Sequence, residues 1–116
     1  MKTEAFRPGE FVLSEGNGQI SRENITIAAG AALEAGTILA KLTATGHYVA
    51  FDPVAAEPAT GSEIAAGVLY ARADATTAAV KAVGIVRHAE VKRSALTGLA
   101  GDAEDDLAQL DIYVRD

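Results

Sequence analysis

The chain has 116 residues, enough to enclose one hydrophobic core and too few for two, so we expect a single domain. Its sixteen acidic and ten basic residues give a net charge of −6, which would repel the phosphate backbone of a nucleic acid. Cysteine is absent, which excludes disulfide bonds, and the two histidines, His47 and His88, are too few for a structural zinc site.

Large apolar side chains are scarce. Apolar residues make up 49% of the chain, but many are alanine, and there are three Phe, three Tyr, one Met and no Trp. Small domains with thin cores commonly gain stability from partners, so we expect oligomerisation. There is no apolar run of 18 residues, and charged residues follow the N-terminus, so we expect a soluble protein without a membrane span, made in a cytoplasm.

Residues 1–20 differ in pattern from the rest of the chain. A turn signal at Arg7-Pro8-Gly9-Glu10 precedes the short apolar run Phe11-Val12-Leu13, and the polar segment Glu15-Gly16-Asn17-Gly18 follows it. Such a short run cannot repay the entropy of ordering by itself. We therefore expect residues 1–20 to form a flexible arm that is mobile unless it lies against another surface; the alternative is a tail without a function.

Short runs with a period near two predict strands at residues 24–27 and 37–43. Glycines fall between these runs, as expected where tight turns need positive φ, at Gly30, Gly36 and Gly46. Pro53 lacks an N–H group to donate, so the ladder should end near residues 51–53.

The second half of the domain begins with a predicted surface loop at residues 54–63. Further strands are expected at residues 66–70 and 79–87, with a turn at residues 74–77 between them. The run at residues 79–87 is the best candidate for a central strand. No internal repeat is convincing.

One short helix is predicted near the C-terminus. Asp102 can act as its N-cap, acidic residues occupy its first turn at Glu104, Asp105 and Asp106, and Leu107 with Leu110 would form the apolar stripe. Residues 112–115 then return to a terminal strand. The fold class is therefore mainly β, with one short C-terminal helix, and residues 21–116 form the β-rich domain.

No catalytic signature is present. None of the serines has a Gly-x-Ser-x-Gly setting, and the histidines lie at a strand end and in a hairpin turn, where surface or hydrogen-bonded roles are expected. Gly16-Asn17-Gly18 lacks the third glycine and the helix of a phosphate-binding loop. We therefore predict no catalytic residue, no cofactor and no metal site.

Several segments, in order, resemble the lambda-type bacteriophage head decoration protein family. The resemblance covers most of the chain, from about Phe6 to the terminal strand, and is weakest between Lys92 and Asp106. Its specificity comes from the order of individually weak matches, which are Ser21-Arg22-Glu23-Asn24-Ile25-Thr26-Ile27-Ala28-Ala29-Gly30, Leu33-Glu34-Ala35-Gly36-Thr37-Ile38-Leu39-Ala40-Lys41-Leu42-Thr43, Thr45-Gly46-His47-Tyr48-Val49-Ala50-Phe51-Asp52-Pro53, Ala65-Ala66-Gly67-Val68-Leu69-Tyr70 and Val83-Gly84-Ile85-Val86-Arg87-His88-Ala89-Glu90-Val91.

This resemblance implies a clip-like β fold and a homotrimer that binds the major capsid protein on the outside of an expanded phage head. The protein would be made in the host cytoplasm, occupy three-fold and quasi-three-fold positions and stabilise the shell without catalysis. The arm would add an extended segment to the shell, so removing residues 1–20 should leave the trimer folded and abolish binding. The implied capsid-binding residues are Phe6, Arg7, Pro8, Gly9, Glu10, Phe11, Val12 and Leu13.

Two alternatives belong to other classes. Ala35-Gly36-Thr37-Ile38-Leu39-Ala40 also resembles strand entries in sugar-acid-binding and biotinyl-type domains, which suggests a small β-clip ligand-binding or carrier module. A carrier would place its modified lysine at a hairpin tip, whereas Lys41 is expected in mid-strand. The other alternative is an accessory subunit of an enzyme.

Overall fold

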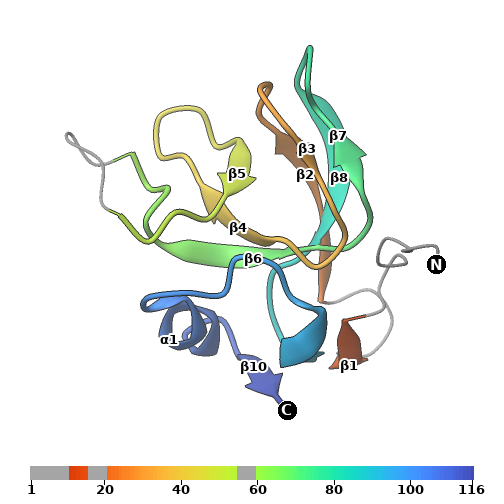
Figure 1. Ribbon diagram of the computed structural model, residues 1–116, viewed down its shortest axis with the longest axis vertical. Coiled ribbons are helices and arrows are strands. Elements are labelled where there is room, and N and C mark those ends of the chain that lie inside the picture. The colour runs from red at the N-terminus through yellow and green to blue at the C-terminus, as the bar shows by residue number, and fades with distance from the viewer. Residues whose placement is uncertain (1–10, 16–20, 55–59) are drawn as a thin grey trace, which may run out of the picture.

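Five strands form a closed barrel in the computed structural model, which describes residues 11–15, 21–54 and 60–116 (Figure 1). Neighbouring strands around the barrel are β2 (Arg22–Ile27), β5 (Tyr48–Ala50), β4 (Ile38–Lys41), β6 (Ala65–Leu69) and β8 (Val80–Ile85). Strand β8 closes the barrel by pairing antiparallel with β2. Every strand of the barrel therefore has two neighbours, which leaves no open edge.

The two central strands of the barrel are buried on both faces. In β4, Ile38 belongs to one hydrophobic cluster and Leu39 to the other, and Val68 and Leu69 of β6 divide in the same way. Successive side chains of a strand point to opposite faces, so one apolar run can supply both clusters. This explains why Ile38, Leu39 and Ala40 are apolar in succession and do not alternate with polar residues.

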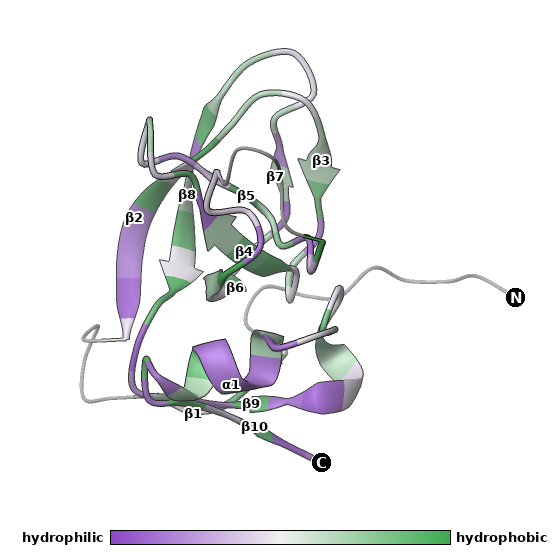
Figure 2. Ribbon diagram, turned by 90° about the vertical axis from the view of Figure 1, so that its left-hand side faces the viewer, coloured by the Kyte–Doolittle hydropathy of each residue, from purple (hydrophilic) through white to green (hydrophobic). Residues whose placement is uncertain are grey.

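A second layer lies below the barrel in Figures 1 and 2. Its three-stranded sheet has the order β1 (Val12–Glu15), β9 (Ala89–Lys92) and β10 (Ile112–Arg115), with β1 antiparallel and β10 parallel to β9. The helix α1 (Ala103–Ala108) contacts both β6 and β10. The smaller elements are the strand pair β3 (Ala32–Leu33) and β7 (Ala73–Asp74) and the 3₁₀ helix η1 (Arg93–Ala95).

The larger hydrophobic cluster joins the two layers. The barrel contributes Ile38, Val68 and Ile85, and all three are fully buried. From the second layer come Phe11, Val91, Leu107 and Ile112, each at most 1% exposed. Burial of these side chains from three strands and a helix makes the second layer an integral part of the domain.

The mainly β fold with one short C-terminal helix is confirmed. Strands occur within or across all the runs predicted between residues 24 and 87, and again at residues 112–115. Strands β1, β5 and β9 were not predicted, and β1 lies within the range predicted as a flexible arm. The short pair of β3 and β7 was not predicted either, so Asp74 lies in a strand where a turn was expected. Of the predicted loop at residues 54–63, residues 55–59 lie outside the described part of the chain.

The predicted role of Asp102 as a capping side chain is wrong. Asp102 occupies the N-cap position, but its side chain makes no capping hydrogen bond, and its backbone (φ −92°, ψ 13°) is not extended as in a regular N-cap. Its carbonyl accepts the N–H of Asp106 at 2.9 Å. Among the described residues, no helix is long and apolar enough to cross a membrane.

Gly36 shows why glycine is needed at one predicted turn. Gly30, Gly36 and Gly46 all have positive φ, as expected. At Gly36 (φ +88°) a Cβ atom would also collide with the carbonyl oxygen of Ala95. The close approach lets Thr97 donate its N–H to the Gly36 carbonyl (2.9 Å), which ties the segment after η1 to the barrel.

Candidate functional site

Three of the eight predicted capsid-binding residues lie within the described part of the chain. Phe6, Arg7, Pro8, Gly9 and Glu10 lie outside the described residues. Phe11 is a turn residue, and Val12 and Leu13 belong to β1, which pairs with β9 through Val12–Val91 and Ser14–Glu90. The register shifts between Val12 and Ser14, which leaves Leu13 at a bulge with 52% of its surface exposed.

Phe11 anchors this segment to the domain. Its side chain is 1% exposed within the larger hydrophobic cluster, and its carbonyl accepts the N–H of Lys92 at 2.7 Å. Deleting residues 1–20 would therefore remove a core aromatic side chain and an entire strand. The expectation that this deletion leaves the fold intact is wrong, and a deletion that ends at residue 10 is the appropriate test.

Ser21, the residue directly before β2, forms a second anchor. It is fully buried, its hydroxyl donates to the carbonyl of His88 (2.7 Å), and its own carbonyl accepts the N–H of Val86 (2.9 Å). The hydroxyl thus bonds to the backbone of His88 and not to its imidazole ring. Ser21 therefore ties the start of β2 to the segment between β8 and β9.

Strand β1 forms one edge of its sheet. It pairs with β9 on one side, and no described residue pairs with its other side. Such an edge presents backbone N–H and C=O groups that can bind a further extended segment. The exposed side chain of Leu13 offers an apolar contact at the same edge.

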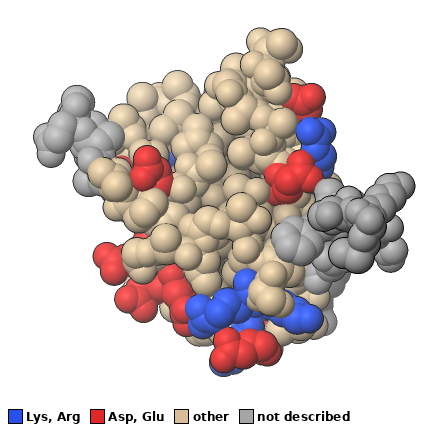
Figure 3. Space-filling view, viewed as in Figure 1, with Lys and Arg blue, Asp and Glu red and all other residues tan. Residues whose placement is uncertain are grey.

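Basic side chains gather close to this sheet. Figure 3 shows Lys and Arg atoms along the lower part of the molecule, and Lys92, Arg93 and Arg115 belong to β9, η1 and β10 there. Arg93 bonds to Asp116 and Glu104, both at 2.9 Å, and these bonds raise the pKa of its guanidinium. Although the chain is acidic overall, this end of the molecule has a mixed charge.

His88 and Asp111 face each other at the turns that lead into β9 and β10. Both have positive φ, at 51° and 60°, and the Nδ1 atom of His88 lies 3.6 Å from Oδ2 of Asp111. The hydroxyl of Tyr113 donates to Oδ1 of Asp111 (3.1 Å), which raises the pKa of that hydroxyl. About half of the His88 side chain and half of the Asp111 side chain are exposed. The expectation that His88 is a surface histidine is therefore confirmed.

Lys41 is the last residue of β4 and not a mid-strand residue as expected. It pairs with Tyr48 of β5, and its ammonium lies 6.0 Å from the centre of the Tyr48 ring. Its place is therefore the base of the β4–β5 hairpin, whereas a carrier lysine belongs at a hairpin tip.

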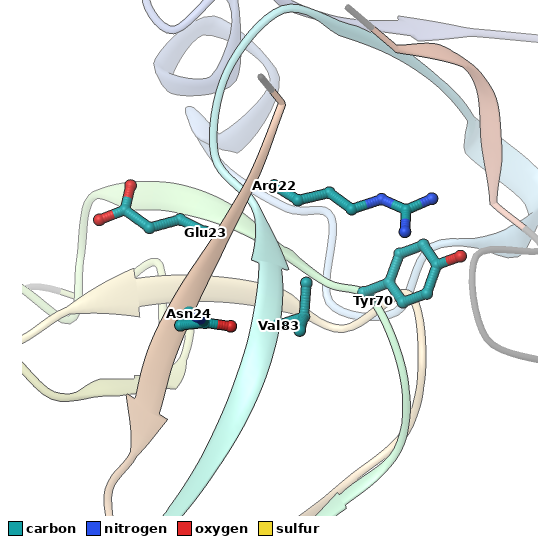
Figure 4. Close-up of a pocket in the computed structure, with 5 residues that line it drawn as sticks. All are labelled: Arg22, Glu23, Asn24, Tyr70 and Val83. Atoms are coloured by element: carbon teal, nitrogen blue, oxygen red, sulfur yellow. The ribbon is translucent and has the colours of Figure 1, made fainter. Parts of the chain in front are cut away.

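A hollow beside β2 and β8 is small, and its own side chains partly occupy it. Its lining includes Arg22, Tyr70 and Val83, and its volume of about 160 Å³ is below the roughly 300 Å³ at which ligand pockets begin. Figure 4 shows the Arg22 side chain extending to the Tyr70 ring and away from Glu23. The guanidinium carbon lies 4.2 Å from the ring centre, the geometry of a cation–π contact. In the described part of the chain, no group of three or more His, Asp or Glu residues could hold a metal ion.

Comparison with known families decides the identity of this fold. The family model described as bacteriophage lambda head decoration protein D matches residues 1–112, which is nearly the whole chain. The chain belongs to the family of the lambda head decoration protein D. This is a family of structural proteins of the bacteriophage head and not an enzyme family, so a role in capsid decoration follows. No curated protein sequence gave a significant match.

The family match includes the segment that the structure describes least. Its range begins at residue 1 and so covers the predicted arm, β1, the barrel, β9, α1 and the first residue of β10. Sequence reasoning missed two features of this decoration protein, namely the anchoring of Phe11 in the core and the open edge of β1. Phe11 was the available signal, because a large aromatic residue is seldom left without a packing partner.

Proposed function

We propose that this protein binds as a homotrimer to the outside of an expanded phage head, at three-fold and quasi-three-fold positions, and stabilises the shell without catalysis. The major capsid protein is its partner, and synthesis takes place in the host cytoplasm. Residues 6–10 engage the shell by adding an extended segment to it, while Phe11 and Val12 hold this segment to the domain. The match of the decoration family across residues 1–112 is the observation that carries this proposal.

The position of Phe11 supports a role for the residues before it. Because Phe11 is fixed in the core, the preceding ten residues start from a defined point beside the open edge of β1. A segment that binds the shell from this point transmits its attachment directly to the folded domain. The exposed Leu13 would then contact the shell beside the added strand.

Stabilisation of the shell follows from linkage. A protein that binds the assembled shell and not its separate subunits favours assembly by mass action. Three copies of the N-terminal segment in one trimer would bind together, so weak individual contacts would sum to tight attachment.

Deletion of residues 1–10 tests the role of the N-terminal segment. Expanded heads that lack the decoration protein, from the phage that encodes this chain, are mixed with full-length or truncated protein and sedimented. We expect the full chain to sediment with the heads and the truncated chain to stay in the supernatant. Both should show the same circular dichroism spectrum, because the deletion leaves Phe11 and β1 in place.

A matched pair of substitutions tests the surface of β1. Leu13→Glu should weaken sedimentation with heads, while Thr77→Glu, which adds the same charge at an exposed residue of the turn before β8, should not. Truncated protein that binds heads as tightly as the full chain would overturn the role of residues 1–10. Failure of the full chain to bind any heads would overturn the proposed function itself.

A further inference from the structure

An uncharged face covers much of one side of the molecule. Figure 3 shows a broad area without charged side chains in front of β3, β4 and β5. Two hollows of about 240 Å³ and 90 Å³ share the residues Leu33 and Ala50, so together they form one groove. The groove is defined by the residues lining the two hollows, which are Ile27, Ala28, Ala29, Gly30, Ala31, Ala32, Leu33, Glu34, Thr37, Ile38, Val49, Ala50, Phe51, Thr97 and Gly98.

The groove is apolar although it faces solvent. Ala29, Ala31, Ala32 and Ala50 are all exposed. Among the described residues that line it, Glu34 alone is charged, and its carboxylate accepts a hydrogen bond from Arg72 at 2.6 Å. The groove therefore exposes small apolar side chains and backbone, with few polar groups that could orient a small ligand.

Net charge indicates what kind of partner fits this groove. Two copies of a chain with a net charge of −6 repel each other, and the repulsion is smallest where the facing surfaces have no charge. The groove comes close to such a surface, because its one charged lining residue, Glu34, is paired with Arg72, and its alanines permit close approach of a second backbone. An apolar surface of this kind is stabilised by burial against another apolar surface.

The chain also has exposed apolar side chains that could fill the groove of a neighbour. Val54 and Ile64 are 72% and 55% exposed. The N–H of Asp52 donates to the Ser62 carbonyl (2.9 Å), so Val54 and Ile64 follow two hydrogen-bonded residues and belong to adjacent segments. A contact between two different surfaces of the same chain closes into a ring when the rotation between copies is suitable.

We propose that the groove is the surface through which copies of this chain associate, with Val54 and Ile64 of one copy seated in the groove of the next. This inference rests on the homotrimer of the proposed function and names its interface. Burial of the groove would also extend the smaller hydrophobic cluster, because Ile27 and Leu33 belong to both. The open edge of β1 is formed by other residues, so it stays available to the shell.

One added charge in the groove tests the interface. Ala31→Glu places a carboxylate at an exposed groove residue, and Ala78→Glu places one at an exposed residue of the turn before β8. Light scattering at micromolar concentration should give a trimer mass for the unchanged chain and for Ala78→Glu, and a monomer mass for Ala31→Glu. A trimer of Ala31→Glu would overturn the groove as the interface and leave the homotrimer intact. Monomeric unchanged chain would overturn the homotrimer as well.

Thiol labelling gives a second readout that adds no charge. The chain has no cysteine, so Ala50→Cys and Ala78→Cys each create a single reactive site. In the trimer, we expect a maleimide to label Ala50→Cys at least about tenfold more slowly than Ala78→Cys, because association hides the groove. Urea should remove the difference. Equal labelling rates in a sample whose mass is that of a trimer would overturn the inference.

Discussion

Phe11 connects the N-terminal segment to the core with one side chain. It packs with Val91 and Ile112 from the two other strands of its sheet and is 1% exposed. Its neighbour Leu13, two residues along the chain, is 52% exposed. Residues of similar hydrophobicity thus have different roles within one short run, one in stability and one at the surface.

Replacement of Phe11 and of Leu13 should separate the stabilising residue from the surface residue. We expect Phe11→Ala to lower the free energy of unfolding by about 3 kcal/mol, because it leaves a cavity in the larger cluster. Leu13→Ala should change it by less than about 0.5 kcal/mol, since that side chain is largely exposed. Urea unfolding followed by circular dichroism measures both. Equal effects of the two substitutions would show that Phe11 is not anchored in the core.

Asp74 offers a test of a local hydrogen-bond pattern. The hydroxyl of Thr76 (2.5 Å) and its backbone N–H (3.1 Å) donate to Oδ1 of Asp74 and hold the pKa of this carboxyl below its usual 3.8. A lowered pKa in the folded state stabilises the fold above the unfolded pKa. That contribution is lost as the pH falls through the folded value.

Substitution of Thr76 should raise the pKa of Asp74. Thr76→Val removes the hydroxyl, which is the largest cause of the shift, and retains the shape of the side chain. Titration of the carboxyl carbon by NMR should then give a higher midpoint than in the unchanged protein. Thr77→Val is the control and should leave the midpoint unchanged. The same midpoint in all three proteins would rule out this hydrogen bond in solution.

At the level of elements, the side chain of Asp106 attaches α1 to the barrel. Asp106 was expected to interact with the helix dipole, but its Oδ2 atom accepts the N–H of Ala65 at 3.0 Å. Ala65 is the first residue of β6, and Leu107 beside Asp106 is fully buried in the larger cluster. The helix therefore docks through this hydrogen bond and through its two buried apolar residues, Ala103 and Leu107.

Removal of this hydrogen bond should loosen the docking of α1. We expect Asp106→Ala to destabilise the protein by about 1–3 kcal/mol, because the partly buried N–H of Ala65 loses its acceptor. Asp105→Ala is the control, since that side chain is exposed on the same turn. Thermal unfolding and hydrogen exchange of the Ala65 amide measure the effect. An amide that exchanges no faster in Asp106→Ala would contradict it.

Local patterns were sufficient to predict four of the five barrel strands, and β5 (Tyr48–Ala50) was not predicted. β2 shows Ile25 and Ile27 at alternate positions, and β4 is a short apolar run that follows a glycine turn. The pairing of β1 with β9 could not be predicted in this way, because it joins residues as far apart as Ser14 and Glu90. Such a contact depends on burial of Phe11 against distant residues, which no local propensity encodes.

The surfaces relevant to function were only partly predictable. The N-terminal segment was identified because it differs in pattern from the domain, whereas the anchoring of Phe11 depends on tertiary packing. The groove combines the alanine-rich turn at residues 28–32 with Ala50 and Thr97 from distant parts of the chain. Its apolar character becomes visible only when the fold brings these segments together.

At the level of the whole molecule, separate surfaces suit separate partners. The sheet with the open edge of β1 has basic side chains and the point from which the first ten residues start. The uncharged groove is formed by barrel strands, β3 and the segment after η1. A trimer associated through the groove would present three copies of the first surface to a shell, which is the arrangement that multivalent attachment requires.

Cryo-electron microscopy of expanded heads is the most direct test of decoration. Heads that lack the protein are imaged before and after addition of the purified full-length chain. We expect new density on the outer surface at the three-fold and quasi-three-fold positions, with three copies of the domain in each. Heads that look the same before and after addition, or density at other positions, would contradict the proposed function.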